Sequence, residues 1–327
     1  MMNIEVRLEL VEVIRQYNLR VGTIESFKKM HILKTERGTK ILKVWNDPKE
    51  LEKAHFYKEL LAKQGFRRIE RFIHTRDGKP YVLYKGQGYS LSDLIEGLPP
   101  SIKRESDIRA TGATLGEFHD SLSKIKTDKK FTRWSFHFEN GLKSLSKLEG
   151  KLKNTNKSEF DQIIINDLKA YKEQINQSIQ MAKSVEKNLV KNGIEPIWCH
   201  GNPKINSFKI DEYGEGWLID FNYPIVDMVA YDMGKLISRL YIKNNYDSKI
   251  VLTFIDSYQN IKPLRPDDKL LLLTYIAYPH NIWKFLQIYL NGSIDTQLTN
   301  KESYEQLVEE QVNMGKLYQE LFTYFKL

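Results

Sequence analysis

Residues 197–236 read IWCHGNPKINSFKIDEYGEGWLIDFNYPIVDMVAYDMGKL, and the interpretation of the whole chain depends on this stretch. A short apolar run ends in the polar loop 200–206, and a second strand-like run, 207–210, follows. A turn at 211–216 leads into a third apolar run, which ends at Asp220. Apolar runs separated by turn residues predict a strand, a loop and a β-hairpin. An acid at the exit of an apolar strand suits a site for a metal and a phosphate; the alternative is an ordinary hairpin with polar ends.

The order of these loop residues resembles that of a known superfamily. His200-Gly201-Asn202, then Asn206, then a hairpin and Ile219-Asp220-Phe221 are similar to the catalytic and metal loops of the aminoglycoside phosphotransferases and choline kinases, whose pattern is H-G-D-x-x-x-x-N followed by I-D-F/L. Within this superfamily the chain most resembles the CotS-type spore coat proteins. Each motif is weak alone, but together and in this order they are fairly specific, and the likeness covers nearly the whole chain. The other matching segments are Asp227, 232–236, 115–119 and 277–280.

The chain departs from the superfamily pattern in three places. Asn202 stands where the enzymes have the catalytic Asp, and only three residues separate it from Asn206, where the enzymes have four. The segment 26–30, at the position of a phosphate-covering turn, contains no glycine. Glycine lets backbone N–H groups approach phosphates closely, so its absence weakens the case for a nucleotide.

Composition limits the classes of protein that the chain can belong to. Its 327 residues suffice for two lobes with a substantial core, and 41% hydrophobic with 28% charged residues is typical of a globular protein. The one cysteine, Cys199, excludes an internal disulfide framework and fits a reducing compartment, so we expect synthesis in the cytoplasm. We expect neither a signal peptide nor a membrane span, because no window approaches 18 uninterrupted apolar residues.

The net charge of +8 favours anionic partners in principle, including nucleic acid. Basic residues, however, alternate with acidic ones almost throughout, and the densest basic groups are short. A solvated charged surface is therefore the preferred interpretation, and we expect no nucleic-acid partner.

The resemblance implies an α+β fold of the bilobal protein kinase-like type. We expect a small sheet-containing N-terminal lobe over residues 1–86 and a larger, mainly helical C-terminal lobe over residues 87–327, with Lys85–Gly88 as the hinge. Asp47-Pro48 predicts the start of a helix that Gly65 ends.

The resemblance also implies which residues would form the site. Lys43, near the end of a predicted strand, takes the position of the lysine that contacts the α- and β-phosphates of a nucleotide. Glu52 or Glu59 of the following helix would pair with it, and Glu59 suits the superfamily spacing. Asp220 and Asn206 would hold Mg²⁺, and His200 would link the two loops structurally. ATP and Mg²⁺ are the cofactors that such a site would take.

The resemblance therefore predicts a spore coat protein with a structural or assembly role and a degenerate phosphotransferase site, a pseudokinase, because Asn202 cannot act as the catalytic base. Other spore coat proteins would be its partners, and the spore coat its location. Two alternatives stay open. One is an active ATP-dependent small-molecule phosphotransferase, and the other is a nucleic-acid binder.

Overall fold

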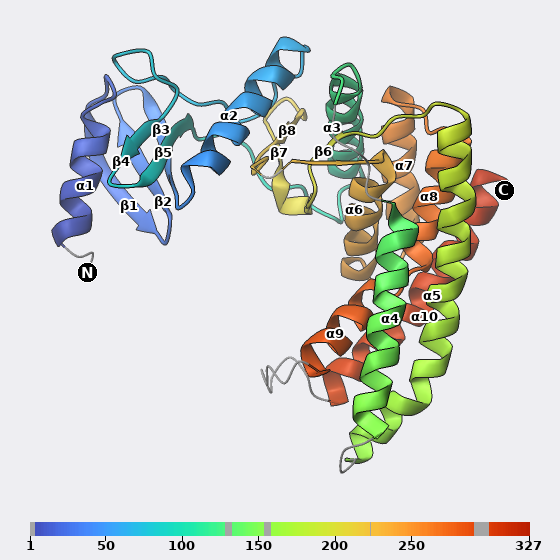
Figure 1. Ribbon diagram of the computed structural model, residues 1–327. Helices are drawn as coiled ribbons and strands as arrows, with labels where there is room; N and C mark the ends of the chain where they lie inside the picture. The colour runs from blue at the N-terminus through green and yellow to red at the C-terminus, as the bar shows by residue number, and fades with distance from the viewer. Residues whose placement is uncertain (1–3, 128–132, 154–157, 223, 291–300) are drawn as a thin grey trace. The chain divides into compact units, whose positions relative to one another are not determined.

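The computed structural model describes residues 4–127, 133–153, 158–222, 224–290 and 301–327 (Figure 1). The chain forms two compact units. Unit 1 comprises Met1–Lys126, His200–Ile225 and Phe254–Lys262, and unit 2 comprises Thr127–Cys199, Val226–Thr253 and Pro263–Leu327. The predicted α+β class is confirmed, because a five-stranded sheet lies in the N-terminal part and most of the remaining chain is helical.

Unit 1 is built on an antiparallel sheet with the strand order β1-β2-β3-β5-β4. The strands and the two helices that accompany them are α1 (Ile4–Ile14), β1 (Val21–Phe27), β2 (Met30–Thr35), β3 (Gly38–Trp45), α2 (Pro48–Lys63), β4 (Val82–Tyr84) and β5 (Gln87–Asp93). Leu10 and Val13 of α1 pack on Leu33, Leu42 and Leu91 of the sheet. This burial places α1 on one face of the sheet.

Helix α2 packs on the side of β3 opposite to Leu42. Successive side chains of a strand point to opposite faces, so Leu42 and Lys43 cannot share a face. Trp45 has the same parity as Lys43, and it packs with Leu51 and Ala54 of α2. The β-alternation therefore turns Lys43 toward the α2 side.

The bounds of α2 follow from its ends, as predicted. The Asp47 side chain accepts a hydrogen bond from the backbone N–H of Lys49 at 2.9 Å, which satisfies a donor at the start of the helix. Gly65 follows the last turn with a φ of 97°, a left-handed conformation that glycine adopts without strain.

One local prediction in this lobe is wrong. Lys85-Gly86 is the turn of the β4–β5 hairpin, in which Tyr84 pairs with Gln87, and it is not a hinge. Both turn residues have positive φ, the conformation of a tight two-residue hairpin. The sheet therefore continues to Asp93.

The rest of unit 1 consists of helix α3 (Glu105–Ser123), the 3-10 turn η1 (Ile205–Ser207), the β-hairpin β7 (Phe208–Ile210) and β8 (Gly216–Leu218), and the second half of α7 (Ser248–Ile261). Gly216 lies against α3, where a Cβ atom would meet the Thr114 hydroxyl at 2.0 Å. His119 of α3 is fully buried, and its Nδ1 atom hydrogen-bonds with the Tyr258 hydroxyl at 2.8 Å.

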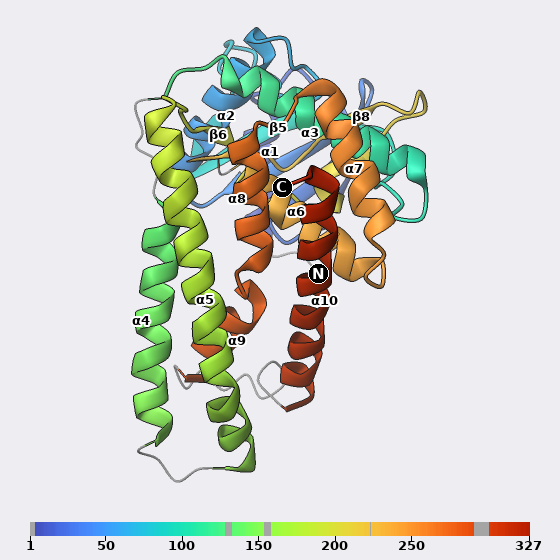
Figure 2. The same ribbon diagram turned by 90° about the vertical axis from the view of Figure 1, so that its right-hand side faces the viewer.

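The described residues of unit 2 form helices and two short paired strands, β6 (Ile197–Cys199) and β9 (Ile225–Asp227). Its helices are α4 (Trp134–Lys153), α5 (Glu159–Lys191), α6 (Val229–Lys243), the first half of α7, α8 (Pro266–Ala277), α9 (His280–Leu290) and α10 (Lys301–Phe325). Helices α4 and α5 lie side by side (Figure 2). Ser158 and Asp161 form a capping box that begins α5. Among the described residues, no helix is both long and apolar enough to cross a membrane.

Asp227 is a buried carboxyl group of unit 2 with a raised pKa. Burial raises its pKa to about 7, although the group accepts hydrogen bonds from the Trp134 indole at 2.8 Å and from the backbone N–H of Met228 at 2.7 Å. The folded state therefore binds a proton more readily than the unfolded state between about pH 4 and pH 7. The group destabilises the fold fully above pH 7, and this penalty disappears as the pH falls below about 4.

We expect Asp227→Asn to be more stable than the wild type at pH 8, by at most about 4 kcal/mol, and to match it near pH 4. The amide oxygen still accepts both hydrogen bonds but carries no charge. Urea unfolding at a series of pH values measures the difference. A difference that does not change with pH would contradict the assignment.

Candidate functional site

The structure brings together two residues that the sequence places far apart. The Nζ atom of Lys43 lies 3.3 Å from Oδ1 of Asp220, and 177 residues separate them. Lys43 also lies over the Trp45 ring, 4.8 Å from its centroid. The lysine is about one third exposed, and 68% of the Asp220 side chain is exposed. A partly exposed cation thus faces a solvent-accessible carboxylate, an arrangement suited to a site that receives a charged ligand.

The backbone of Asp220 is unusual in a way that helps to position its carboxylate. Its φ is 62°, in the left-handed region, which Asp tolerates better than most residues. The neighbouring Asn222 is buried and donates a hydrogen bond from its amide to Oδ1 of Asp220. Backbone strain of this kind concentrates at functional sites. Lys43 and Asn222 both use Oδ1, which leaves Oδ2 as the better-placed oxygen for a ligand.

Asn206 and Asp220 flank the β7–β8 hairpin. In this hairpin Phe208 pairs with Leu218, and the backbone N–H of Ile219 donates to the carbonyl of Ser207 at 2.8 Å. Asn206 is exposed on the 3-10 turn η1, directly before β7, and Asp220 follows β8. A joint role of these two side chains as metal ligands stays a prediction.

The loop that precedes η1 holds Asn202 at the surface. Asn202 is exposed, whereas His200 is buried and its ring contacts those of Phe118 and Phe221, with centroids 6.4 and 5.8 Å away. The backbone N–H of Asn202 points at Nδ1 of His200 at 3.4 Å. His200 thus reaches the second loop by ring packing on Phe221, while its contact with Asn202 lies within its own loop.

The structure does not place Glu59 on Lys43. Glu59 forms an ion pair with Arg71, at 2.9 and 2.5 Å, so the expected pairing with Lys43 is not formed. Glu52, the other candidate, is exposed. Lys58, the residue before Glu59, is the buried one. Because successive side chains of a helix point about 100° apart, Glu59 points in another direction. A role for Glu59 in cofactor binding stays a prediction.

Lys58 is the functional-site neighbour that sequence reasoning missed. It is fully buried, donates to Glu70 at 2.6 Å and lies over the Phe72 ring, 4.9 Å from its centroid. Burial lowers its pKa, while the charges of Lys43 and Asp220 also act on it, with opposite signs. Helix α2 therefore contributes a second cation near Lys43, where the superfamily resemblance led us to expect an acid.

A signal for Lys58 exists in the sequence. Leu51, Ala54, Lys58 and Leu61 follow helical spacing, so a lysine interrupts an otherwise apolar stripe. Phe56 of the same helix is exposed. The sequence does not indicate the contact of Asn222 with Asp220, apart from its position two residues after Asp220.

The donor set of this site fits Mg²⁺. Mg²⁺ prefers oxygen ligands and is usually held by one or two carboxylates together with substrate phosphates. Asp220 supplies a solvent-accessible carboxylate, and Asn206 supplies an exposed amide on the other side of the β7–β8 hairpin in sequence.

One family model matches the chain. It is described as "Spore coat putative kinase YutH" and matches residues 11–323. The chain belongs to the YutH family. The resemblance to spore coat proteins with a kinase-like pattern is thereby confirmed. No curated protein sequence matches the chain.

Solved structures similar to this YutH-family chain share its fold. An aminoglycoside phosphotransferase from Alicyclobacillus acidocaldarius is 18% identical with a TM-score of 0.81, and the match covers 95% of this chain and 96% of that one. Spectinomycin phosphotransferase APH(9)-Ia, solved with ADP and spectinomycin, is 13% identical with a TM-score of 0.62 and coverage of 100% and 99%. A choline/ethanolamine kinase family protein from Mesorhizobium loti is 14% identical with a TM-score of 0.56 and coverage of 97% and 99%. The predicted kinase-like fold is confirmed.

Proposed function

We propose that this protein is a structural or assembly component of the spore coat with a degenerate phosphotransferase site. One observation supports the proposal above the others. By the superfamily resemblance, Asn202 stands where the enzymes have the catalytic Asp, in a site that otherwise keeps the Lys43–Asp220 contact. The YutH-family membership supports the coat context.

The chemistry of Asn202 supports a loss of catalysis. Phosphoryl transfer to a hydroxyl uses a carboxylate that orients the acceptor and takes its proton, and a neutral amide takes no proton at any relevant pH. Pro203 follows directly and biases the backbone of Asn202 away from helical geometry. The loop to Asn206 is one residue shorter than in the enzymes, so another side chain cannot simply move into the position of the base.

The site keeps groups suited to binding a nucleotide. Asp220 and Asn206 would hold Mg²⁺, and Lys43 would contact the phosphates. The bound ion would neutralise charge between the phosphate oxygens. Without a glycine in the β1–β2 turn, fewer backbone N–H groups can approach those phosphates, so we expect weak affinity at most.

The alternative function is an active small-molecule phosphotransferase that uses a different base. The exposed Asp220 with Lys43 at 3.3 Å favours it, because this pair is what the chemistry needs for metal and phosphate.

A complementation experiment tests the proposal. In a spore-forming bacterium that lacks this protein, wild type and Asp220→Ala should enter the coat fraction equally, as measured by immunoblotting of coat extracts. Equal incorporation is expected because assembly uses the surface and not the cleft chemistry. Loss of incorporation in Asp220→Ala, with unchanged thermal stability, would show that the coat role needs the site.

Nucleotide binding makes a separate prediction. If the wild type shows a thermal shift with Mg-ATP, Asp220→Ala should abolish its Mg-dependent part, because the variant loses the carboxylate that would bridge metal and phosphates. Asn202→Asp should leave the shift unchanged, since that residue faces the acceptor. A ligand at 100 times its Kd stabilises by about 2.7 kcal/mol, so titration to millimolar ATP detects even weak binding. A Mg-dependent shift that survives Asp220→Ala would contradict the metal assignment.

A further inference from the structure

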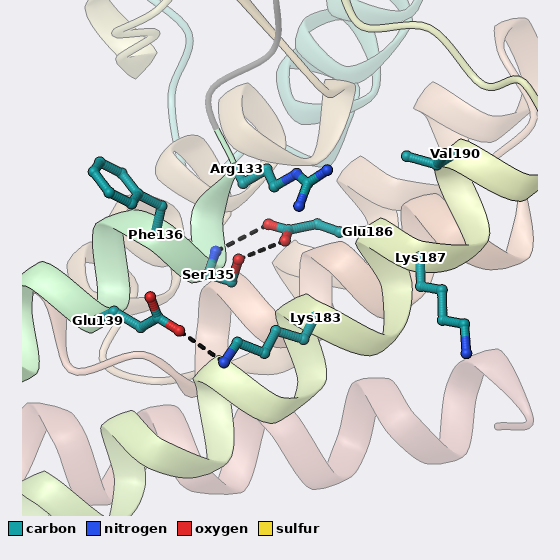
Figure 3. Close-up of a pocket in the computed structure, with 8 residues that line it drawn as sticks. All are labelled: Arg133, Ser135, Phe136, Glu139, Lys183, Glu186, Lys187 and Val190. Carbon is teal, nitrogen blue, oxygen red and sulfur yellow. Dashed lines mark hydrogen bonds and ion pairs between the residues drawn. The ribbon is translucent and has the colours of Figure 1, made fainter.

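Unit 2 carries a hollow between the N-terminal end of α4 and the C-terminal half of α5 (Figure 3). Its volume is about 530 Å³, within the range that accommodates a bulky side chain together with flanking backbone. The lining residues are Arg133, Ser135, Phe136, Glu139, Lys183, Glu186, Lys187 and Val190. We call this hollow the α4–α5 groove.

The acids of the α4–α5 groove are already engaged. Glu186 is buried and accepts the backbone N–H and the hydroxyl of Ser135, at 2.9 and 2.5 Å. Glu139 pairs with Lys183 at 2.7 Å. Arg133 and Lys187 have no acidic partner among the residues that the structure describes. Lys187 and Lys191 also continue the row that begins at Lys183, at helical spacing on one side of α5.

The same groove has apolar edges. Phe136 is 55% exposed and Val190 72% exposed. Large exposed apolar side chains beside unpaired cations are typical of a binding surface. The cations and the exposed apolar side chains of the groove together favour a partner segment that carries an acidic residue next to an apolar or aromatic one.

Unit 1 contains a segment with this chemistry, at the tip of the β7–β8 hairpin. The tip reads Asp211-Glu212-Tyr213-Gly214-Glu215, and Tyr213 is 83% exposed. Leu98, beside the hairpin, is 71% exposed and bonded by its backbone to Ile210. Glu212 is exposed and has no cationic partner within the described part of the chain. The tip thus displays an unpaired acid next to an aromatic anchor.

The tip is also rigid. The Asp211 side chain accepts the backbone N–H groups of Tyr213 and Glu215, at 3.0 and 2.9 Å, and the Trp217 indole at 2.9 Å. These bonds lower the pKa of Asp211 against the opposing effect of burial, so its charge is kept. A preorganised tip loses little conformational entropy on docking.

We propose that the hairpin tip of one copy docks into the α4–α5 groove of a second copy, with Tyr213 between Phe136 and Val190 and Glu212 facing Lys187. This inference rests on the assembly role proposed above, and it assigns the hairpin tip and the α4–α5 groove as the surfaces through which copies assemble. The two surfaces are different patches, so the contact is head-to-tail and each copy has one of each. Such contacts propagate into extended assemblies or rings.

The experiment uses the full chain and charge reversal. Sedimentation velocity over a range of protein concentrations should show concentration-dependent association of the wild type. Glu212→Lys and Lys187→Glu should each weaken it at least about tenfold, because each places like charges opposite one another. Tyr213→Ser should weaken it through loss of the anchor. Glu302→Lys and Lys249→Glu, with the same charge changes at exposed positions elsewhere, should associate like the wild type.

A mixture provides the decisive test. In an equimolar mixture of Glu212→Lys and Lys187→Glu chains, each tip meets a groove of opposite charge only on the other variant. We expect the mixture to recover association that neither variant shows alone, and to lose it at high salt because the ion pairs are partly exposed. A monomeric wild type at every concentration, or a mixture that stays dissociated, would overturn the proposal.

The result separates this inference from the proposed function. If the chains do not associate but still enter the spore coat, the docking contact is wrong and the coat role is served by other surfaces. If the chains associate as expected but are absent from the coat, the proposed function fails while the contact stands.

Discussion

Purified protein should transfer the γ-phosphate of ATP at a background rate to aminoglycoside, choline or homoserine-like acceptors. A positioned general base contributes roughly 10²–10⁴ to the rate, about 3–5 kcal/mol, and Asn202 cannot supply it. Coupled or radiolabelled-phosphate assays at saturating ATP and Mg²⁺ measure the turnover. A kcat of order 1 s⁻¹, ordinary for an enzyme, would contradict the degenerate-site proposal.

Asn202→Asp alone should restore little of this activity, because the loop to Asn206 remains one residue short. We expect larger recovery when Asn202→Asp is combined with one residue inserted between Lys204 and Ile205, since the acid then has the spacing of the enzymes. Asp220→Ala in the same background serves as the control and should remove the recovered activity. Robust phosphotransfer by Asn202→Asp without the insertion would show that loop length was harmless.

Lys58→Ala should lower the free energy of unfolding by about 3 kcal/mol. The variant leaves Glu70, only 21% exposed at its side chain, without the ammonium group that it contacts at 2.6 Å. It also removes the aliphatic stem packed against Phe72. Urea unfolding and amide hydrogen exchange of α2 measure the loss, and the second method isolates unit 1.

Two matched variants show whether the charge pair is the cause. Lys63→Ala removes an exposed lysine from the same helix and should cost less than about 0.5 kcal/mol. Lys58→Met with Glu70→Gln removes both charges while keeping a long buried side chain, and it should recover most of the loss. If the double variant is as unstable as Lys58→Ala, packing rather than the uncompensated carboxylate sets the effect.

Local chemistry explains what the sequence could predict. Helix α2 begins and ends where Asp47 and Gly65 predict, because capping depends on residues within a few positions of the helix end. The hairpin that carries Asn206 and Asp220 was predictable for the same reason, since turn residues separate two short apolar runs. The prediction of a hinge at Lys85-Gly86 is wrong, because glycine suits a hinge and a hairpin turn equally well. Only the pairing of β4 with β5 shows that these residues form a hairpin turn.

The sequence by itself determined the class of fold, the family and the altered residue Asn202, since these depend on the identity and order of residues. Tertiary structure alone decided the partners of Lys43, Lys58 and Glu59. An amphipathic helix specifies its buried side only within about one residue, and a step of one residue turns the side chain by about 100°. That step buries Lys58 and leaves Glu59 to Arg71. Lys43 meets Asp220 across 177 residues of chain, a separation over which packing and not local preference sets the contact.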